Sequence, residues 1–248
     1  MNEKKIRIAK IISHAGLCSR AEAEKIIENG KVTINNKPFF EYLISENQIN
    51  QICVYGKPLK KVDLRVWCFY KPKGYVCSNR EQSNQKSFFR ILPKTMPRVV
   101  SVGRLDILSE GLLLLTNSPT FSNFMEKPSN VIERKYNVKV FGKFDPEIFS
   151  SLKKGITIKG IKYKGLFVNS LTSKKNNNFL NIRIYEGKNR EIRKILSHFN
   201  LEVKILRRLA YGPFELANLK PGEIEEVNNY KLKKYLKKIK FHYESNIR

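Results

Sequence analysis

Aspartate and arginine are scarce in this chain. Of its 22 acidic residues only three are aspartates, Asp63, Asp106 and Asp145, and arginine supplies 14 of the 48 basic residues. In a chain that uses glutamate and lysine almost everywhere, an aspartate or arginine is a candidate for a position where geometry demands that side chain. A biased composition also leaves such residues by accident, so scarcity only ranks the candidates.

Cysteine pairs and metal-binding patterns are missing. The four cysteines, Cys18, Cys53, Cys68 and Cys77, are scattered, with no CxxC pair and no nearby histidine cluster. Free thiols in a reducing compartment are therefore expected. The three histidines are far apart and have no metal-ligand spacing. We expect neither a metal site nor a cofactor.

Long apolar runs and several catalytic motifs are also absent. No stretch approaches the roughly 20 apolar residues that span a bilayer, and the N-terminus leads into polar sequence rather than an apolar signal core. We therefore expect a cytoplasmic protein without membrane contact. The sequence has no DxD pair, no glycine-rich phosphate loop and no GxSxG elbow. Metal-assisted phosphoryl transfer, nucleotide hydrolysis and serine hydrolysis have no visible residues.

Positive charge dominates what is present. The 48 basic and 22 acidic residues give a formal net charge of +26, while a hydrophobic content of 41% is ordinary for a folded chain. A folded body this basic needs a compensating polyanion, and nucleic acid is the usual one. An anionic membrane surface is the rival, but it usually attracts one amphipathic helix. Here the basic residues run from Lys4 to Arg248.

The first sixty residues have the pattern of a small α/β module. Apolar spacing predicts a helix that stops near Gly16, and the segment 19–22 fits a capping box for a second helix that stops at Gly30. An alternating strand at 31–34 then turns at residues 35–36. Candidate phosphate contacts on this module are Arg7, Lys10, Ser19 and Arg20. A merely solvated helix face is the alternative.

Beyond a boundary at residues 55–63, which combine glycine, proline and lysine, the pattern turns to strands. Strands are predicted at 66–70, 99–102, 112–115, 135–140 and 180–185, with a polar loop at 173–178. The tail at 231–240 has apolar residues at helical spacing among many lysines. It is predicted as a short, basic surface helix.

The loop 103–111 lies between two predicted apolar strands and holds Asp106 next to Arg104 and Leu105. A carboxylate at the end of buried strands can act as a nucleophile, kept ionised by nearby positive charge. The alternative is a turn aspartate that is hydrogen-bonded to its own loop. The loop alone does not decide between them.

A second constellation occupies residues 186–196. Asn189 is a candidate N-cap, and Ile192, Ile195 and Leu196 form an apolar stripe that predicts a helix packed on the sheet. Three basic residues project from the first turns, where the helix dipole also favours anions: Arg190, Arg193 and Lys194. An arginine there can hold a phosphate or pair with an aspartate. Ordinary solvated charges are the alternative.

Together these motifs resemble the RsuA-type pseudouridine synthases, which modify ribosomal RNA and carry an N-terminal ribosomal-protein-type RNA-binding domain. The resemblance rests on Gly-Arg-Leu-Asp at 103–106 and Gly-Leu-Leu-Leu-Leu-Thr-Asn at 111–117. Further matches follow in order at 70–74, 134–136, 186–196, 211–214 and 219–223, and the N-terminal domain matches through residues 16–32. Two departures are Ser109 in place of threonine and Asn117-Ser118-Pro119 in place of an Asn-Asp-Gly turn.

The resemblance implies a role for each matching residue. Asp106 is the expected catalytic carboxylate at the anomeric carbon, Tyr136 lies against the target base, and Arg193 pairs with Asp106. Arg104 is expected to brace the gap left by the flipped nucleotide, because a base inside a stacked helix shields its glycosidic carbon. The remaining expected contacts are Leu196 in the pocket wall, and Lys71 and Lys73 at the wall and phosphates.

The implied fold is α+β: a small αα-hairpin/β RNA-binding module (1–62), a mixed, largely antiparallel sheet domain with flanking helices (63–230) and a basic tail (231–248). The implied enzyme is a monomer that acts on ribosomal RNA or pre-ribosomal particles. Residues 70–74 and 97–106 are closest to the large-subunit (23S) enzymes. A 16S enzyme is one alternative. The other is a non-catalytic RNA-binding or ribosome-assembly protein, which would need only the N-terminal module.

Overall fold

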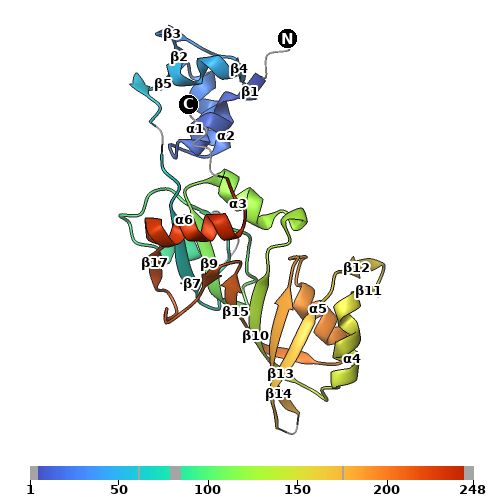
Figure 1. Cartoon of the computed structure of the whole chain (residues 1–248). Helices are drawn as coiled ribbons and strands as arrows, with labels where there is room; N and C mark the ends of the chain where they lie inside the picture. The colour runs from blue at the N-terminus through green and yellow to red at the C-terminus, as the bar shows by residue number, and fades with distance from the viewer. Residues whose placement is uncertain (1–4, 61, 79–84, 175, 243–248) are drawn as a thin grey trace.

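The computed structural model describes residues 5–60, 62–78, 85–174 and 176–242. Its N-terminal module, blue in Figure 1, packs two helices against short strands. The helices are α1 (Ile8–His14) and α2 (Arg20–Glu28). The strands are β1 (Lys5–Arg7), β2 (Val32–Ile34), β3 (Lys37–Pro38), β4 (Leu43–Ser45), β5 (Ile52–Val54) and β6 (Lys57–Pro58), with the 3-10 helix η1 (Glu46–Gln51) before β5. β1 pairs with β4, and the other four form a sheet in the order β3-β2-β5-β6.

Local sequence rules account for this module. The predicted capping box is confirmed: the Ser19 hydroxyl accepts a hydrogen bond from the Glu22 amide (3.2 Å), and the Glu22 carboxylate accepts one from the Ser19 amide (2.7 Å). The turn between β2 and β3 is also confirmed, because Asn35 and Asn36 both have the positive φ angles that a tight hairpin turn requires. Isoleucines from both helices then fill a separate small core.

The rest of the chain is built on one mixed sheet in the order β13-β14-β10-β15-β9-β7-β17, with β16 beside β15 and β8 beside β9. The strands are β7 (Val66–Lys71), β8 (Val100–Ser101), β9 (Glu110–Thr116), β10 (Arg134–Phe141), β13 (Phe167–Lys174), β14 (Asn177–Ile184), β15 (Glu202–Tyr211), β16 (Phe214–Glu215) and β17 (Ile224–Glu226). All its described pairings are antiparallel except that of β9 with β15. The expected α+β class is confirmed.

Helices and short turns flank this sheet (Figure 1). The helices are α3 (Pro119–Glu126), α4 (Pro146–Ser151), α5 (Glu191–His198) and α6 (Asn229–Lys238), and the 3-10 turns are η2 (Phe88–Ile91), η3 (Pro128–Asn130) and η4 (Leu152–Lys154). A small hairpin joins β11 (Ile156–Ile158) to β12 (Ile161–Tyr163). Among the described residues, no helix is both long and apolar enough to cross a bilayer.

Both faces of the sheet are buried around β9, which explains its unbroken leucine run. Leu113 and Leu115 belong to one apolar cluster, and Leu112 and Leu114 belong to a second cluster on the other face. All four are completely buried. Successive side chains of a strand point to opposite faces, so a strand covered on both sides reads as continuously apolar rather than alternating.

Gly111 lets β9 approach β15 at the point where the Asp106 loop joins the sheet. Its φ is +99°, and a Cβ atom there would lie 2.4 Å from the carbonyl oxygen of Arg208. Only glycine combines this conformation with such close contact. The parallel pair β9–β15 therefore fixes the end of the loop against β15.

The secondary structure of one segment, residues 173–178, differs from the sequence-based expectation. Residues 173–178 were predicted as a polar loop, but β13 continues to Lys174 and β14 starts at Asn177, while Lys175 lies outside the described residues. Polar residues pair across this hairpin, and Asn178 is fully buried with its amide donating to the Gly142 carbonyl oxygen (2.8 Å). Local polarity thus hid the strands.

The basic tail forms the predicted helix, α6, and the helix packs on the sheet domain. Leu232 is buried in the second cluster, with Tyr235 and Leu236 packed against it. We therefore propose that α6 belongs to the second domain rather than to a separate tail. Residues 243–248 lie outside the described part of the chain.

Candidate active site

A cavity of about 610 Å³ opens beside the sheet where the Asp106 loop, β10, β15 and the start of α5 meet. Side chains of both signs line it, and those used below are Asp106, Arg134, Tyr136, Glu186, Glu191 and Arg208. Arg104 and Arg190 also line the cavity, and both are exposed. Residues more than 100 positions apart in the sequence thus surround one space that can admit a nucleotide-sized ligand.

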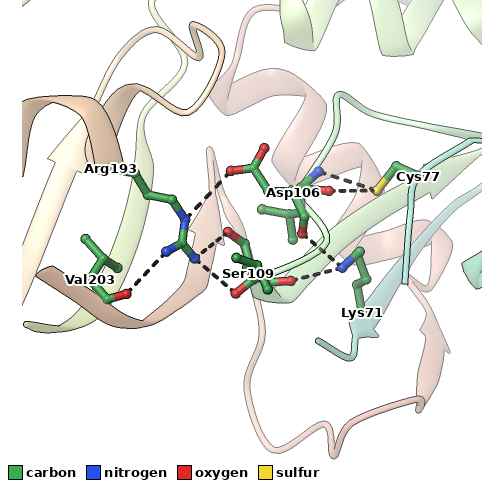
Figure 2. A network of polar contacts seen from close by, with 8 residues as sticks. Lys71, Cys77, Asp106, Ser109, Arg193 and Val203 are labelled. Carbon is green, nitrogen blue, oxygen red and sulfur yellow. Dashed lines mark hydrogen bonds and ion pairs between the residues drawn. The ribbon is translucent and has the colours of Figure 1, made fainter. Parts of the chain in front are cut away.

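Lys71 holds the Asp106 loop from below. Its ammonium group donates to the carbonyl oxygens of Ser109 (2.9 Å), Pro72 (3.0 Å) and Asp106 (3.3 Å), as Figure 2 shows for the two loop residues. Lys71 is completely buried, which lowers the pKa of its ammonium group to about 8. The expectation that Lys71 contacts RNA is therefore wrong, because its buried ammonium group binds backbone carbonyl oxygens of the protein.

The other side of the loop rests on Cys77 and on the turn after β7. The Leu105 amide donates to the Cys77 sulfur (3.4 Å), which in turn lies 3.4 Å from the Leu105 carbonyl oxygen. The Gly74 amide donates to the Ile107 carbonyl oxygen (2.7 Å). These bonds fix the backbone on both sides of Asp106, so the carboxylate is presented to the cavity from a rigid support.

Arg193, from α5, lies against Asp106, the neighbour that the family resemblance implies for it (Figure 2). Its Nε is 3.9 Å from the Asp106 carboxylate, while Nη2 donates to the Leu108 carbonyl oxygen (3.0 Å) and the Ser109 hydroxyl (3.3 Å). The Arg193 side chain is 12% exposed and that of Asp106 is 32% exposed. The guanidinium is thus anchored to the loop, and the carboxylate stays open on its outer side. Their catalytic roles stay predictions.

Tyr136 and Arg104 line the same cavity as Asp106, and their roles toward a nucleotide stay predictions. Tyr136 lies on β10, is 7% exposed and lines the same cavity as Asp106. Arg104 precedes the carboxylate by two residues, lines the cavity and is exposed. The Arg104 side chain is thus open to solvent, whereas the tyrosine ring is buried in the cavity wall.

Other predicted site residues lie elsewhere. Leu196 is completely buried in the main apolar cluster, so the expectation that it lines the pocket is wrong; Ile192, one turn earlier, does so. Asn189 is not the N-cap of α5, because Arg190 takes that position with a left-handed φ of 52°. Lys73 and Lys194 are exposed and do not line the cavity. On the N-terminal module, the side chains of three expected phosphate contacts are exposed: Arg7, Lys10 and Arg20. The fourth, Ser19, caps α2.

Sequence reasoning missed a pair of buried carboxylates, Glu186 and Glu191, in the cavity wall. They are 4% and 3% exposed and both line the cavity. Glu186 accepts from the Lys164 amide (2.6 Å) and lies 3.2 Å from the Lys188 ammonium, and Glu191 accepts from the Lys188 amide (3.0 Å). Burial, followed by the Glu186 charge, raises the pKa of Glu191 to about 7. The available sequence signal for this pair was two glutamates, Glu186 and Glu191, on either side of the turn that contains Gly187.

Glu191→Gln should remove a pH dependence of stability. The pKa of Glu191 rises from 4.5 in the unfolded chain to about 7 in the fold, so its proton stabilises the fold fully below pH 4.5 and this stabilisation is lost as the pH rises through 7. Glutamine keeps the neutral form at every pH. Between pH 5 and pH 8 the Tm of the wild type should fall by several degrees more than that of the variant, at roughly 2–4 °C per kcal/mol.

Thermal melts of both proteins at several pH values measure this difference. Glu202→Gln is the matched control, since it removes an exposed carboxylate on β15 that lies outside the cavity. Parallel curves for wild type and Glu191→Gln would contradict a shared proton at this pair.

Known proteins resemble this chain along nearly its whole length. Residues 65–198 match the family model of RNA pseudouridylate synthases, and residues 6–38 match that of the S4 domain. An uncharacterised RNA pseudouridine synthase of Rickettsia typhi is 40% identical over 93% of this chain and 95% of its own. Proteins named ribosomal large subunit pseudouridine synthase B are 32% identical in Bacillus subtilis and 35% identical in Buchnera aphidicola, each over 92% of this chain and 94% of its own.

A solved structure agrees on the fold. A crystal structure of a pseudouridylate synthase superimposes with a TM-score of 0.66 at 23% identity, covering 93% of this chain and 99% of that chain. Its likeness extends over both the N-terminal module and the sheet domain.

Proposed function

This chain belongs to the RNA pseudouridine synthase family, and on that premise we propose that it converts a specific uridine of large-subunit (23S) ribosomal RNA to pseudouridine. Support for the large subunit comes from the two relatives named ribosomal large subunit pseudouridine synthase B. The observation that carries the chemistry is the open Asp106 carboxylate in the cavity wall, held 3.9 Å from the Arg193 guanidinium behind it.

The reaction is an isomerisation, so its atoms balance without an added reagent. The bond from the ribose C1′ to N1 of uracil breaks, a bond from C1′ to C5 forms, the hydrogen leaves C5, and N1 gains a proton. Such chemistry needs a group that stabilises the electron-poor C1′ while the base turns. A carboxylate meets that need either as a nucleophile or as a nearby negative charge.

Four side chains receive roles on this basis. Asp106 acts at C1′, and Arg193 orients its carboxylate through the contact at 3.9 Å. Tyr136 lies against the base, and Arg104, an exposed residue of the cavity lining, braces the strand from which the nucleotide has been flipped. A cavity lined by both Asp106 and Tyr136 supports placing the uridine between them.

The N-terminal module supplies affinity that does not depend on sequence. Lys10 and Arg20 are exposed on its two helices and Arg7 is exposed at the end of β1, and the S4 family match includes all three positions. Salt-sensitive contacts with phosphates are the expected result of such a basic face. We propose that the protein acts on ribosomal RNA in the cytoplasm as a monomer.

Deleting the gene and mapping pseudouridines in both ribosomal RNAs tests the assignment. The deletion should remove a modification from large-subunit RNA, and re-expression of the wild type should restore it. Loss of a small-subunit pseudouridine instead would refute the 23S target while keeping the enzyme class. An unchanged map in both RNAs would favour a non-catalytic role in ribosome assembly.

A further inference from the structure

Two buried arginines, Arg134 and Arg208, lie in the wall of the cavity. Arg134, at the start of β10, is 7% exposed, and Arg208, on β15, is 2% exposed. Their guanidinium carbons lie 4.5 Å and 5.1 Å from the centre of the Tyr211 ring. Within the described part of the chain, neither arginine forms an ion pair with a carboxylate.

Few hydrogen bonds compensate for burying these two charges. Arg134 donates through Nη2 to the Tyr211 hydroxyl (2.6 Å), and Arg208 donates through Nε to the Leu112 carbonyl oxygen (2.7 Å). The Nη2 atom of Arg208 is buried without a hydrogen-bond partner. Removing a charge from water is unfavourable unless an opposite charge or hydrogen bonds replace the lost hydration. The arrangement is therefore unfavourable in the free protein.

The fold holds Arg208 rigidly beside the proposed chemistry. Its backbone pairs with Gly111, which ends the Asp106 loop, and its side chain bonds to the next residue of β9. Arg208 thus lies near the loop that carries the carboxylate, and its position does not depend on a flexible surface segment.

We propose that Arg134 and Arg208, stacked on Tyr211, form a subsite for a phosphate of the RNA strand next to the target uridine. A phosphodiester brings the missing negative charge, and its oxygens suit the forked guanidinium. A neutral uracil carbonyl would supply an acceptor but would leave both charges uncompensated. This proposal depends on the proposed function only because the phosphate is assumed to belong to an RNA substrate.

The test compares Arg208→Gln with Arg207→Gln, the neighbouring residue on β15. Arg207 lies 2.7 Å from Glu110, does not line the cavity and is 43% exposed, so it is a matched control. Single-stranded decauridylate binding is measured at several salt concentrations. The slope of log K against log salt should become shallower by about 0.7 in Arg208→Gln, which corresponds to one phosphate contact. It should stay unchanged in Arg207→Gln and in the charge-preserving Arg208→Lys.

Melting experiments separate binding from a structural role. In chloride buffer the Tm of Arg208→Gln should equal or exceed that of the wild type, because the substitution removes a buried uncompensated charge. Uridine 5′-monophosphate should stabilise the wild type more than uridine does, and Arg208→Gln should lose that excess. A lower Tm with an unchanged salt slope would overturn the subsite. So would an equal loss of stabilisation by uridine, which would place the contact on the base.

Pseudouridine formation in a large-subunit RNA transcript is followed with the same preparations. The wild type could convert uridine while Arg208→Gln binds decauridylate as the wild type does. That outcome would overturn the subsite and leave the proposed function intact. A wild type that shows the predicted phosphate effects but converts no uridine would contradict the proposed function and leave the subsite supported.

Discussion

Asp106→Asn should abolish uridine isomerisation, lowering the single-turnover rate on large-subunit RNA by at least about 10⁴-fold, as is typical when a reacting group is removed. Asparagine has the same shape but carries no negative charge to offer to C1′. The Asp106 backbone should stay in place, because Lys71, Cys77 and Gly74 hold the loop through backbone atoms rather than through the carboxylate. Folding should therefore be preserved.

RNA binding distinguishes this outcome from a damaged protein. Removing one negative charge from a basic RNA-binding cavity should leave the affinity equal or somewhat higher. Asp63→Asn makes the same change at an exposed position outside the cavity and should keep the wild-type rate. Turnover by Asp106→Asn within tenfold of the wild type would eliminate the proposed role of the carboxylate.

Local rules made much of the fold predictable from the sequence. The capping box at Ser19, the paired asparagines at 35–36 and the apolar run of β9 each specify an element through neighbouring residues, and all three are present. The proximity of Asp106 and Arg193 was predictable in another way. It came from the family resemblance, and the structure brings together two residues 87 positions apart.

The misplaced residues depend on long-range geometry that local patterns do not contain. Lys71 ends a strand next to proline and lysine, which suggests a surface position, and only the return of the loop 35–38 residues later provides the carbonyls that bury it. Leu196 shares an apolar helical stripe with Ile192. The orientation of α5 against the sheet, which no helical period specifies, places Ile192 at the cavity and Leu196 in the core.

The scarcity of aspartate and arginine identified only some of the site residues. It ranked Asp106 and the arginines highly, but it did not distinguish Arg193 from Arg134 and Arg208. Alternation along β10 and β15 could have shown that Arg134 and Arg208 share the buried face with Tyr136 and Leu206. The glutamate pair at 186 and 191 was missed because glutamate is the chain's ordinary acid, so composition gave it no weight.

Arg193→Met should lower the isomerisation rate by about 10²–10³-fold, comparable to the loss of one preorganised donor at a reacting group. The variant removes the positive charge 3.9 Å from Asp106 and the bonds from Nη2 to Leu108 and Ser109. The carboxylate remains, so the loss should be smaller than in Asp106→Asn. Arg193→Lys should recover part of the rate, because an ammonium restores the charge but cannot contact Asp106 and the loop together.

A double-mutant cycle shows whether Arg193 acts through Asp106. If it does, adding Arg193→Met to Asp106→Asn should cost almost nothing further, since the two groups then work as one unit. Lys204→Met, which removes an exposed charge paired with Glu202 on β15, should keep the wild-type rate. If the rate of the double variant instead falls by the product of the two single-variant factors, the contribution of Arg193 does not depend on the carboxylate that it faces. Arg193 would then act on the RNA directly.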